Sequence, residues 1–275
     1  PKSSTGLKRS ELGCAPDHLM AMEELVRRPH GMIFATGPTG SGKTTTLYAI
    51  LTRLDRVGRN VVTVEDPVEY QLTRATQIQV HPKIGLDFAS GLRAILRQDP
   101  DVIMVGEIRD LETLRMAIQA ALTGHLVLTT VHCNDAASGA SRLVDMGAEP
   151  FLVASSATVF LSQRLVRKIC DKCKVEDQPS AEVLAALGIE DGSTFYRGRG
   201  CEYCRGTGYF GRTSVFEIMM VNDDISAAIT RRETAGEIRR LARSLGMRSL
   251  RDDAIEKARQ GVTTLEEVTR AVWVQ

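Results

Sequence analysis

Aromatic side chains are scarce in this sequence, at 5% of 275 residues, and the formal net charge is only +1. Proteins that stack nucleic-acid bases place aromatic rings on a positively charged surface, so neither value favours nucleic-acid binding. Long uncharged apolar runs are also missing. The nearest candidate, residues 151–162, is shorter than a membrane span and contains Ser155, Ser156 and Thr158, so we expect no direct membrane insertion.

Cysteine is limited to six residues, which are too few and too unevenly spaced for a secreted disulfide scaffold. No signal peptide is recognisable, and we therefore expect a cytoplasmic protein. The sequence begins at Pro1, which is not a natural first residue, so we expect a fragment or a processed form. Its length suits one medium domain with appendages rather than one small core.

A glycine-rich loop organises the sequence. Its residues are Gly37, Pro38, Thr39, Gly40, Ser41, Gly42, Lys43 and Thr44. The apolar run 32–35 before it has the length of a strand, and apolar residues within 47–54 recur with helical spacing after it. This context predicts a P-loop that binds ATP or ADP. We expect Lys43 to reach the β- and γ-phosphates, Thr44 to ligate Mg²⁺, and the backbone through Thr45 to surround the phosphates.

Strands and helices alternate along the first two thirds of the chain. The patterns predict strands at 61–64, 102–105 and 126–131, and helices at 19–26, 88–96 and 118–122. Alternation at this spacing is typical of a mostly parallel sheet with helices on both faces. We therefore predict an α/β fold of the RecA-like P-loop NTPase type.

Carboxylates stand where two of the predicted strands end. They are Glu65, Asp66 and Glu69 after one strand and Glu107 after the other. Hydrolysis needs a carboxylate that orients or deprotonates water and a second group that helps to hold Mg²⁺. The alternative interpretation is that these acids cap loops or pair with Arg93, Arg97 or Arg109.

Two C-x-x-C pairs predict a zinc site. Their members are Cys170, Cys173, Cys201 and Cys204. Two short loops can present four thiolates tetrahedrally to Zn²⁺, and four thiolates leave no open position for catalysis. A disulfide pair or free thiols are the alternatives. Cys14 and Cys133 have no matching partners, and we expect plain thiols there.

The character of the chain changes after about Val166, and we expect four segments. Residues 1–18 are a linker or the stub of a missing upstream domain, 19–166 the ATPase core, 167–212 the tetracysteine zinc module, and 213–275 a C-terminal strand with a helical subdomain. In the last segment, Thr234 with Glu237 and Thr264 with Glu267 have the spacing of capping boxes.

Taken in order, the motifs resemble those of the secretion-ATPase superfamily, in its type II secretion and type IV pilus assembly branch. They are the Walker A loop at 37–44, the aspartate box at 64–70, the atypical Walker B segment at 105–110, the histidine box at 123–126 and 131–132, the tetracysteine module and the tail at 251–268. The resemblance covers nearly all of the chain from Leu19 onward. The tetracysteine module distinguishes it from the pilus-retraction branch, which lacks one.

The resemblance also implies roles for individual residues. Glu69 would activate the attacking water, and Glu107 would act with Thr44 on Mg²⁺. His132 would sense the γ-phosphate or couple it to the neighbouring domain, with His125 in support. Cys133 is a departure, because the family usually has threonine there.

At the level of the whole protein, the resemblance implies a homo-hexameric ATPase whose missing upstream domain supplies arginines to the phosphates. It would power type II secretion or type IV pilus assembly from the cytoplasmic face of the inner membrane, through membrane platform proteins. Two other interpretations remain open. One is a nucleic-acid translocase whose zinc ribbon grips DNA, and the other is a nucleotide-dependent scaffold without catalysis.

Overall fold

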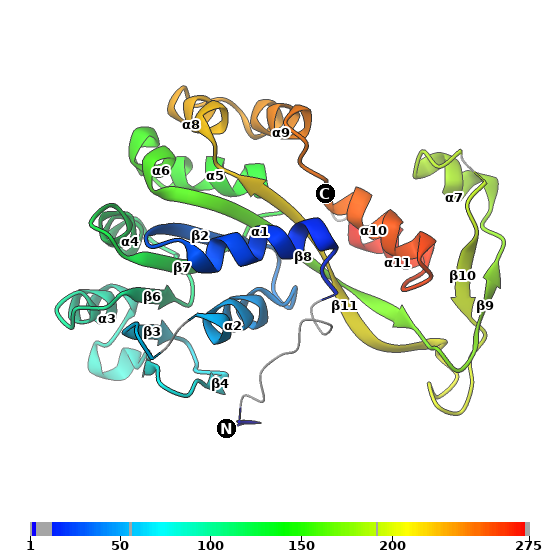
Figure 1. Cartoon of the computed structure of the whole chain (residues 1–275), viewed down its shortest axis with the longest axis horizontal. Helices are drawn as coiled ribbons and strands as arrows, with labels where there is room; N and C mark the ends of the chain where they lie inside the picture. The colour runs from blue at the N-terminus through cyan, green and yellow to red at the C-terminus, as the bar shows by residue number, and fades with distance from the viewer. Residues whose placement is uncertain (1, 4–12, 55–56, 191, 273–275) are drawn as a thin grey trace.

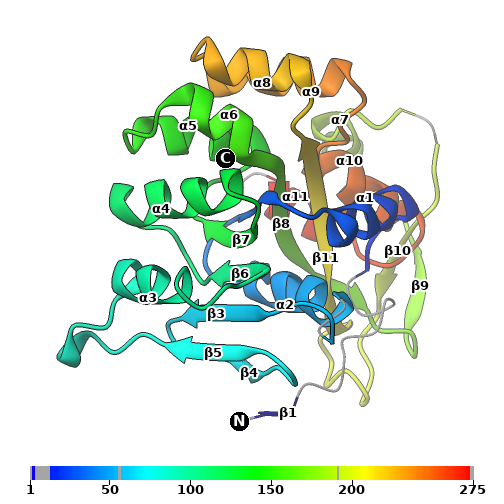
Figure 2. The ribbon, with the colours of Figure 1, turned by 60° about the vertical axis from the view of Figure 1, so that its left-hand side comes forward.

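A seven-stranded sheet forms the centre of the computed structural model, which describes residues 2–3, 13–54, 57–190 and 192–272. Its strands are β2 (Gly31–Thr36), β3 (Val61–Glu65), β5 (Thr76–Gln79), β6 (Val102–Val105), β7 (Leu126–Val131), β8 (Ala157–Ile169) and β11 (Tyr209–Met220). Their order is β11-β8-β2-β7-β6-β3-β5 (Figures 1 and 2). The pairs from β8 to β5 are parallel and β11 is antiparallel to β8, which confirms the predicted α/β fold.

Helices cover both faces of this sheet, as Figure 2 shows. One face carries α3 (Phe88–Ile95), α4 (Leu111–Leu122), α5 (Ala136–Asp145), α6 (Pro150–Ser156), α8 (Asp223–Thr230) and α9 (Ala235–Ser244). The other face carries α1 (Pro16–Arg27) and α2 (Lys43–Arg53). Coverage on both faces explains why β2, β3, β6 and β7 are buried at every position and read as continuous apolar runs.

The central strand β2 contributes to the cores on both faces. Met32 and Phe34 pack on the side of α3 to α6, and Ile33 and Ala35 pack on the side of α1 and α2. The ring of Phe34 stacks on that of Phe160 from β8, with 4.8 Å between ring centroids. Alternate residues of a strand point to opposite faces, so β2 joins the two halves of the core.

A third apolar cluster packs against β8 and β11 at Val166 and Val215. The C-terminal helices α10 (Leu250–Arg259) and α11 (Leu265–Val272) pack there with α7 (Ala181–Ala186) and the hairpin of β9 (Lys174–Asp177) and β10 (Phe195–Gly198). Figure 1 shows the hairpin and α7 beside α10 and α11, away from the rest of the sheet. The residues between the two cysteine pairs are therefore an antiparallel hairpin with a short helix.

The expected segment boundaries fall inside strands. Those near residues 166 and 212 lie within β8 and β11, which pair with each other from Tyr209 to Met220 and continue the main sheet. The expected C-terminal strand has its apolar residues near 214–218, and β11 extends beyond them in both directions. Most of the expected tail at 1–18 lies outside the described residues. Within the described part, β1 (Lys2–Ser3) pairs with β4 (Tyr70–Gln71), and α1 begins at Pro16.

The two expected capping boxes have different outcomes. Thr234 and Glu237 form a complete box at the start of α9, which confirms that prediction. At α11 only half of the box is present: Thr264 accepts the backbone N–H of Glu267, but the Glu267 carboxylate binds Arg167 instead. No helix in the described part of the chain is long and apolar enough to cross a membrane.

Candidate functional site

Four neighbouring strands, β2, β7, β6 and β3, end at the same edge of the sheet, and the loops that follow them form the candidate site. The loop after β2 leads directly into α2. Gly37 has φ 146°, and a Cβ there would lie 2.7 Å from the carbonyl oxygen of Gln163. Gly42 has φ 90° immediately before α2. The loop therefore needs glycine at both positions, for conformation and for space.

Lys43 lies inside the curve of this loop. Its Nζ donates hydrogen bonds to the carbonyl oxygens of Gly37 at 2.8 Å and Pro38 at 3.0 Å, and the residue is buried. Burial lowers the pKa of Lys43, while the charge of Glu107 opposes that shift. The ammonium group is thus held next to backbone groups that surround phosphate in P-loops.

A cleft of about 190 Å³ brings most of the predicted site together. Its lining residues are Thr39, Gly40, Lys43, Thr44, Glu65, Asp66, Pro67, Glu69, Phe88, Gly106, Glu107, Thr130 and His132. All four predicted carboxylates are among them, as is His132. Of the other loop residues, Gly37, Pro38, Ser41, Gly42 and Thr45 do not line this cleft.

Glu107 contacts two side chains at the cleft. Arg109 donates to its Oε1, and His132 Nε2 lies 3.5 Å from its Oε2. Burial raises the pKa of Glu107, but the hydrogen bond and charge of Arg109 and the contact with His132 outweigh it, so the pKa lies below its usual value. The alternative prediction of arginine pairing thus applies to Glu107, whereas Arg93 pairs with Glu112.

The acids that follow β3 differ from one another in exposure. Glu65 is only 2% exposed, and its carboxylate accepts hydrogen bonds from Tyr48, Thr63 and Gln77. Asp66 and Glu69 are exposed at the cleft. An exposed carboxylate at the cleft can reach water, whereas Glu65 is already occupied by protein donors.

His125 lies at the opposite edge of the sheet from His132. It precedes β7 and His132 follows it, so the six residues of β7 separate them by about 20 Å. The Nδ1 of His125 is 2.8 Å from the carbonyl oxygen of Ala120. His125 does not line the cleft, so the structure does not bring it together with His132 at this site.

Two lining residues lie outside every predicted motif: Phe88 and Thr130. The hydroxyl of Thr130 donates to the carbonyl of Gly106 at 2.8 Å and so joins the ends of β7 and β6. Thr130 lies two residues before His132 at the end of a predicted strand, and that position could have identified it as a site residue. Phe88 belongs to the start of α3, and nothing local in the sequence marks it.

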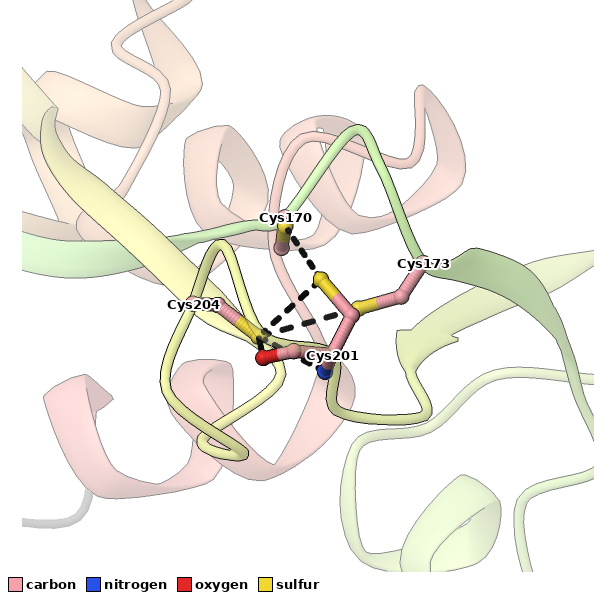
Figure 3. A group of neighbouring side chains, drawn as sticks. All are labelled: Cys170, Cys173, Cys201 and Cys204. Carbon is pink, nitrogen blue, oxygen red and sulfur yellow. Dashed lines mark hydrogen bonds between the residues drawn. The ribbon is translucent and has the colours of Figure 1, made fainter.

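The four predicted cysteines converge on one point, as Figure 3 shows. Cys170 and Cys173 follow β8, and Cys201 and Cys204 precede β11. All four sulfur atoms lie within 4.8 Å of one another, with Sγ–Sγ distances of 3.8 Å for Cys170–Cys201, 3.9 Å for Cys173–Cys204 and 3.7 Å for Cys201–Cys204. A tetrahedral ZnS₄ centre with Zn–S bonds of about 2.3 Å has sulfur–sulfur edges of about 3.8 Å.

Backbone groups complete the surroundings of the cysteine cluster. The N–H groups of Cys201 and Gly208 donate to Cys204 Sγ at 3.2 and 3.3 Å. Such donors stabilise thiolates around a metal. All four cysteines are free rather than disulfide-bonded, so the residues present fit a zinc ion better than the disulfide alternative.

A family model of type II/IV secretion system proteins matches residues 1–270. The chain belongs to this family. It is 51% identical over 269 residues to the type II secretion system protein HxcR of Pseudomonas aeruginosa, covering 98% of this chain and 54% of that protein. It is 50% identical over 262 residues to the type IV pilus assembly ATPase PilB of Thermus thermophilus, covering 94% of this chain and 30% of that protein. The chain thus spans about half, or less, of these relatives.

Solved structures of the family have the same fold. The chain matches a crystal structure of the pilus retraction motor PilT with bound ADP at a TM-score of 0.72 and 28% identity, covering 98% of this chain and 68% of that one. It matches the Legionella pneumophila ATPase DotB at a TM-score of 0.71 and 25% identity, covering 98% and 66%. The family membership confirms the resemblance drawn from the motifs, and it favours that interpretation over a nucleic-acid translocase.

Proposed function

We propose that this chain is the ATP-hydrolysing motor domain of an ATPase that powers type II secretion or type IV pilus assembly. The observation that carries the proposal is the single cleft lined by Lys43 and Thr44 of the P-loop together with Glu69, Glu107 and His132. Family membership and the printed names of relatives from both pathways support it. The same cleft holds the catalytic acids that a nucleotide-dependent scaffold would not need.

The loop residues bind the nucleotide in this proposal. Backbone N–H groups of residues 37 and 39–45 and the positive end of α2 hold the phosphates, and Lys43 neutralises the charge of the β- and γ-phosphates. The Thr44 hydroxyl and the Glu107 carboxylate are hard oxygen donors, which suit Mg²⁺. Bound Mg²⁺ would supply charge neutralisation on the phosphate oxygens.

Glu69, Glu107 and His132 would carry the reaction itself, and Arg109 would hold Glu107 in place. Glu69 is exposed at the cleft, where it orients the attacking water and accepts its proton. Arg109 keeps Glu107 ionised and oriented, since it donates to Oε1. His132 contacts Glu107 Oε2, so it is placed to respond to charge that arrives between Glu107 and the P-loop.

The cysteine cluster would hold one structural Zn²⁺ through Cys170, Cys173, Cys201 and Cys204. Four sulfur ligands close the coordination sphere, so the ion would tie the end of β8 to the start of β11 and take no part in hydrolysis. We further propose that the full-length protein is a homo-hexamer at the cytoplasmic face of the inner membrane. There it would act on membrane platform proteins, with arginines of an upstream domain completing the nucleotide site.

The test compares Glu69→Gln with Glu107→Gln in single-turnover ATP hydrolysis, with protein in excess so that slow turnover is detected. Glu69→Gln should still bind Mg-ATP and stall hydrolysis, because an amide keeps the shape but accepts no proton. Glu112→Gln is the matched control, since Glu112 pairs with Arg93 outside the cleft. If Glu107→Gln alone stalls, the two acids are reversed, and if neither stalls, this cleft is not the hydrolytic site.

A further inference from the structure

A buried hydrogen-bond network lies behind the cleft, between the P-loop helix α2 and the segment that carries Glu69. Tyr48 of α2, which is 2% exposed, donates its hydroxyl hydrogen to Oε2 of Glu65 at the end of β3. Oε1 of Glu65 accepts from the Thr63 hydroxyl at 2.5 Å and from Gln77 Nε2 of β5 at 3.1 Å. The network thus links α2, β3 and β5.

Glu65 acts as the centre of this network. A carboxylate offers about four acceptor positions, and three of those on Glu65 are taken by protein donors. Burial raises the pKa of Tyr48, and the hydrogen bond and charge of Glu65 raise it further, so the phenol remains protonated and keeps donating. A carboxylate held in this way orients its neighbours, and most of its acceptor positions are closed to water.

Two glutamines of β5 hold the backbone on both sides of Glu69, and one of them, Gln77, belongs to the network. Gln77 Nε2 donates to the carbonyl oxygen of Tyr70 at 3.0 Å, and its Oε1 accepts the N–H of Leu72 at 2.7 Å. On the other side, Gln79 Oε1 accepts the N–H of Val68 at 3.3 Å. Glu69 itself is exposed, so these contacts fix the position of its backbone rather than its side chain.

Tyr48 connects this segment to the helix that follows the nucleotide loop. It lies on the same helix as Lys43 and Thr44, and its ring meets that of Tyr70 edge-on at 5.6 Å between centroids. The helix that begins with the phosphate-binding residues is therefore linked to the segment of Glu69 through the side chain of Tyr48. Tyr48 makes this link in two ways. Its hydroxyl donates to Glu65, and its ring packs against the ring of Tyr70.

We propose that Tyr48 and Gln77 are positioning residues for hydrolysis, which set the distance between Glu69 and the P-loop. The inference rests on the proposed function, because it takes Glu69 as the group that activates water. Binding of nucleotide depends on the loop and Lys43, which the network does not touch. Loss of the network should therefore lower kcat and leave nucleotide affinity nearly unchanged.

The experiment uses Tyr48→Phe and Gln77→Leu in the whole chain, with hydrolysis measured against ATP concentration. We expect kcat to fall about tenfold or more in each, because a displacement of about 1 Å can cost roughly a hundredfold. The KM for ATP and the Kd of a fluorescent ADP analogue should stay within about twofold. Because both residues act through Glu65, the double variant should lose less than the product of the two single effects.

Thr52→Val is the matched control. It also removes one hydroxyl from α2, where Thr52 bonds the carbonyl of Ala49 and is not part of the network. Tyr48→Phe keeps the buried ring, and thermal melting checks that the variant folds. If it does not fold, the kinetics of Gln77→Leu, on the half-buried strand β5, test the positioning role. An unchanged kcat, or a raised KM at unchanged kcat, would overturn the positioning role. A wild-type chain that does not bind nucleotide would instead refute the proposed function.

Discussion

Replacing Glu267 with glutamine should destabilise the C-terminal helices by a measurable amount. Glu267 lies at the start of α11 and its side chain is fully buried. Its Oε2 accepts the backbone N–H of Arg167 at 2.7 Å and Arg270 Nη2 at 2.7 Å, and its Oε1 accepts Nε and Nη2 of Arg167 at 2.9 and 2.8 Å. This one carboxylate therefore connects α11 to β8.

The size of the loss in stability depends on how well water can solvate the two arginines once the charge of Glu267 is removed. Removing one partner of a buried ion pair costs about 3–5 kcal/mol, because the other charge is left uncompensated. Here the Arg167 and Arg270 side chains are 42% and 59% exposed, so water can solvate both after the change. We therefore expect Glu267→Gln to lower the free energy of unfolding by about 2–3 kcal/mol.

Urea denaturation at pH 7 measures this loss, and Glu266→Gln is the control. Glu266 is the neighbouring acid, but it is exposed, and it accepts a long hydrogen bond of 3.4 Å from the Tyr209 hydroxyl. Its replacement should change the free energy of unfolding by less than about 0.5 kcal/mol. Equal effects of the two variants would refute the reasoning.

The pH dependence of the same comparison gives a second check. Burial raises the pKa of Glu267, but the hydrogen bonds from Arg167 and Arg270 outweigh it, so the pKa in the folded state is lowered. Such a group contributes stability that is fully present above the unfolded pKa, near 4.5, and is lost as the pH falls below it. The difference between wild type and Glu267→Gln should therefore shrink below about pH 4.5. A difference that grows on acidification would contradict the assignment.

Three further outcomes are expected. Lys43→Ala should abolish binding of a fluorescent nucleotide with an unchanged circular dichroism spectrum, and normal ATP turnover in that variant would rule out the P-loop assignment. Metal analysis of protein purified without chelator should find one zinc per chain, absent in Cys204→Ser, and a Cys170–Cys204 disulfide without zinc would refute the site. Burial lowers the pKa of His18 despite the nearby charges of Asp253 and Asp17, so the unfolded chain binds the proton more tightly. Stability should therefore fall as the pH drops below about 6.5, and His18→Gln should remove that part of the decline in a urea series.

Much of the fold and part of the site depend on local patterns and were predictable. The P-loop is a contiguous run whose glycines, lysine and threonine determine its shape and chemistry together. Strands β3, β6 and β7 were predictable because parallel strands buried on both faces are continuous apolar runs. The C-x-x-C spacing likewise brings each cysteine pair together within one short loop.

The sequence does not show which acids of one short segment are exposed. Glu65 and Glu69 are four positions apart and have the same side chain, yet one is buried among Tyr48, Thr63 and Gln77 and the other is exposed at the cleft. Two of the three donors that distinguish them, Tyr48 and Gln77, come from α2 and β5. Their approach depends on the way that helix and strand pack against β3.

Long-range contacts explain the other differences between expectation and structure. Thr264 and Glu267 have the spacing of a capping box, but Arg167 lies 100 positions away and takes the carboxylate. His125 and His132 are seven positions apart, and the strand between them places them at opposite edges of the sheet. The sequence by itself determined the loop, the strands and the chemical groups, because those depend on neighbouring residues. Only the tertiary structure decided which groups meet, because the order β2-β7-β6-β3 places the ends of strands from distant parts of the chain side by side.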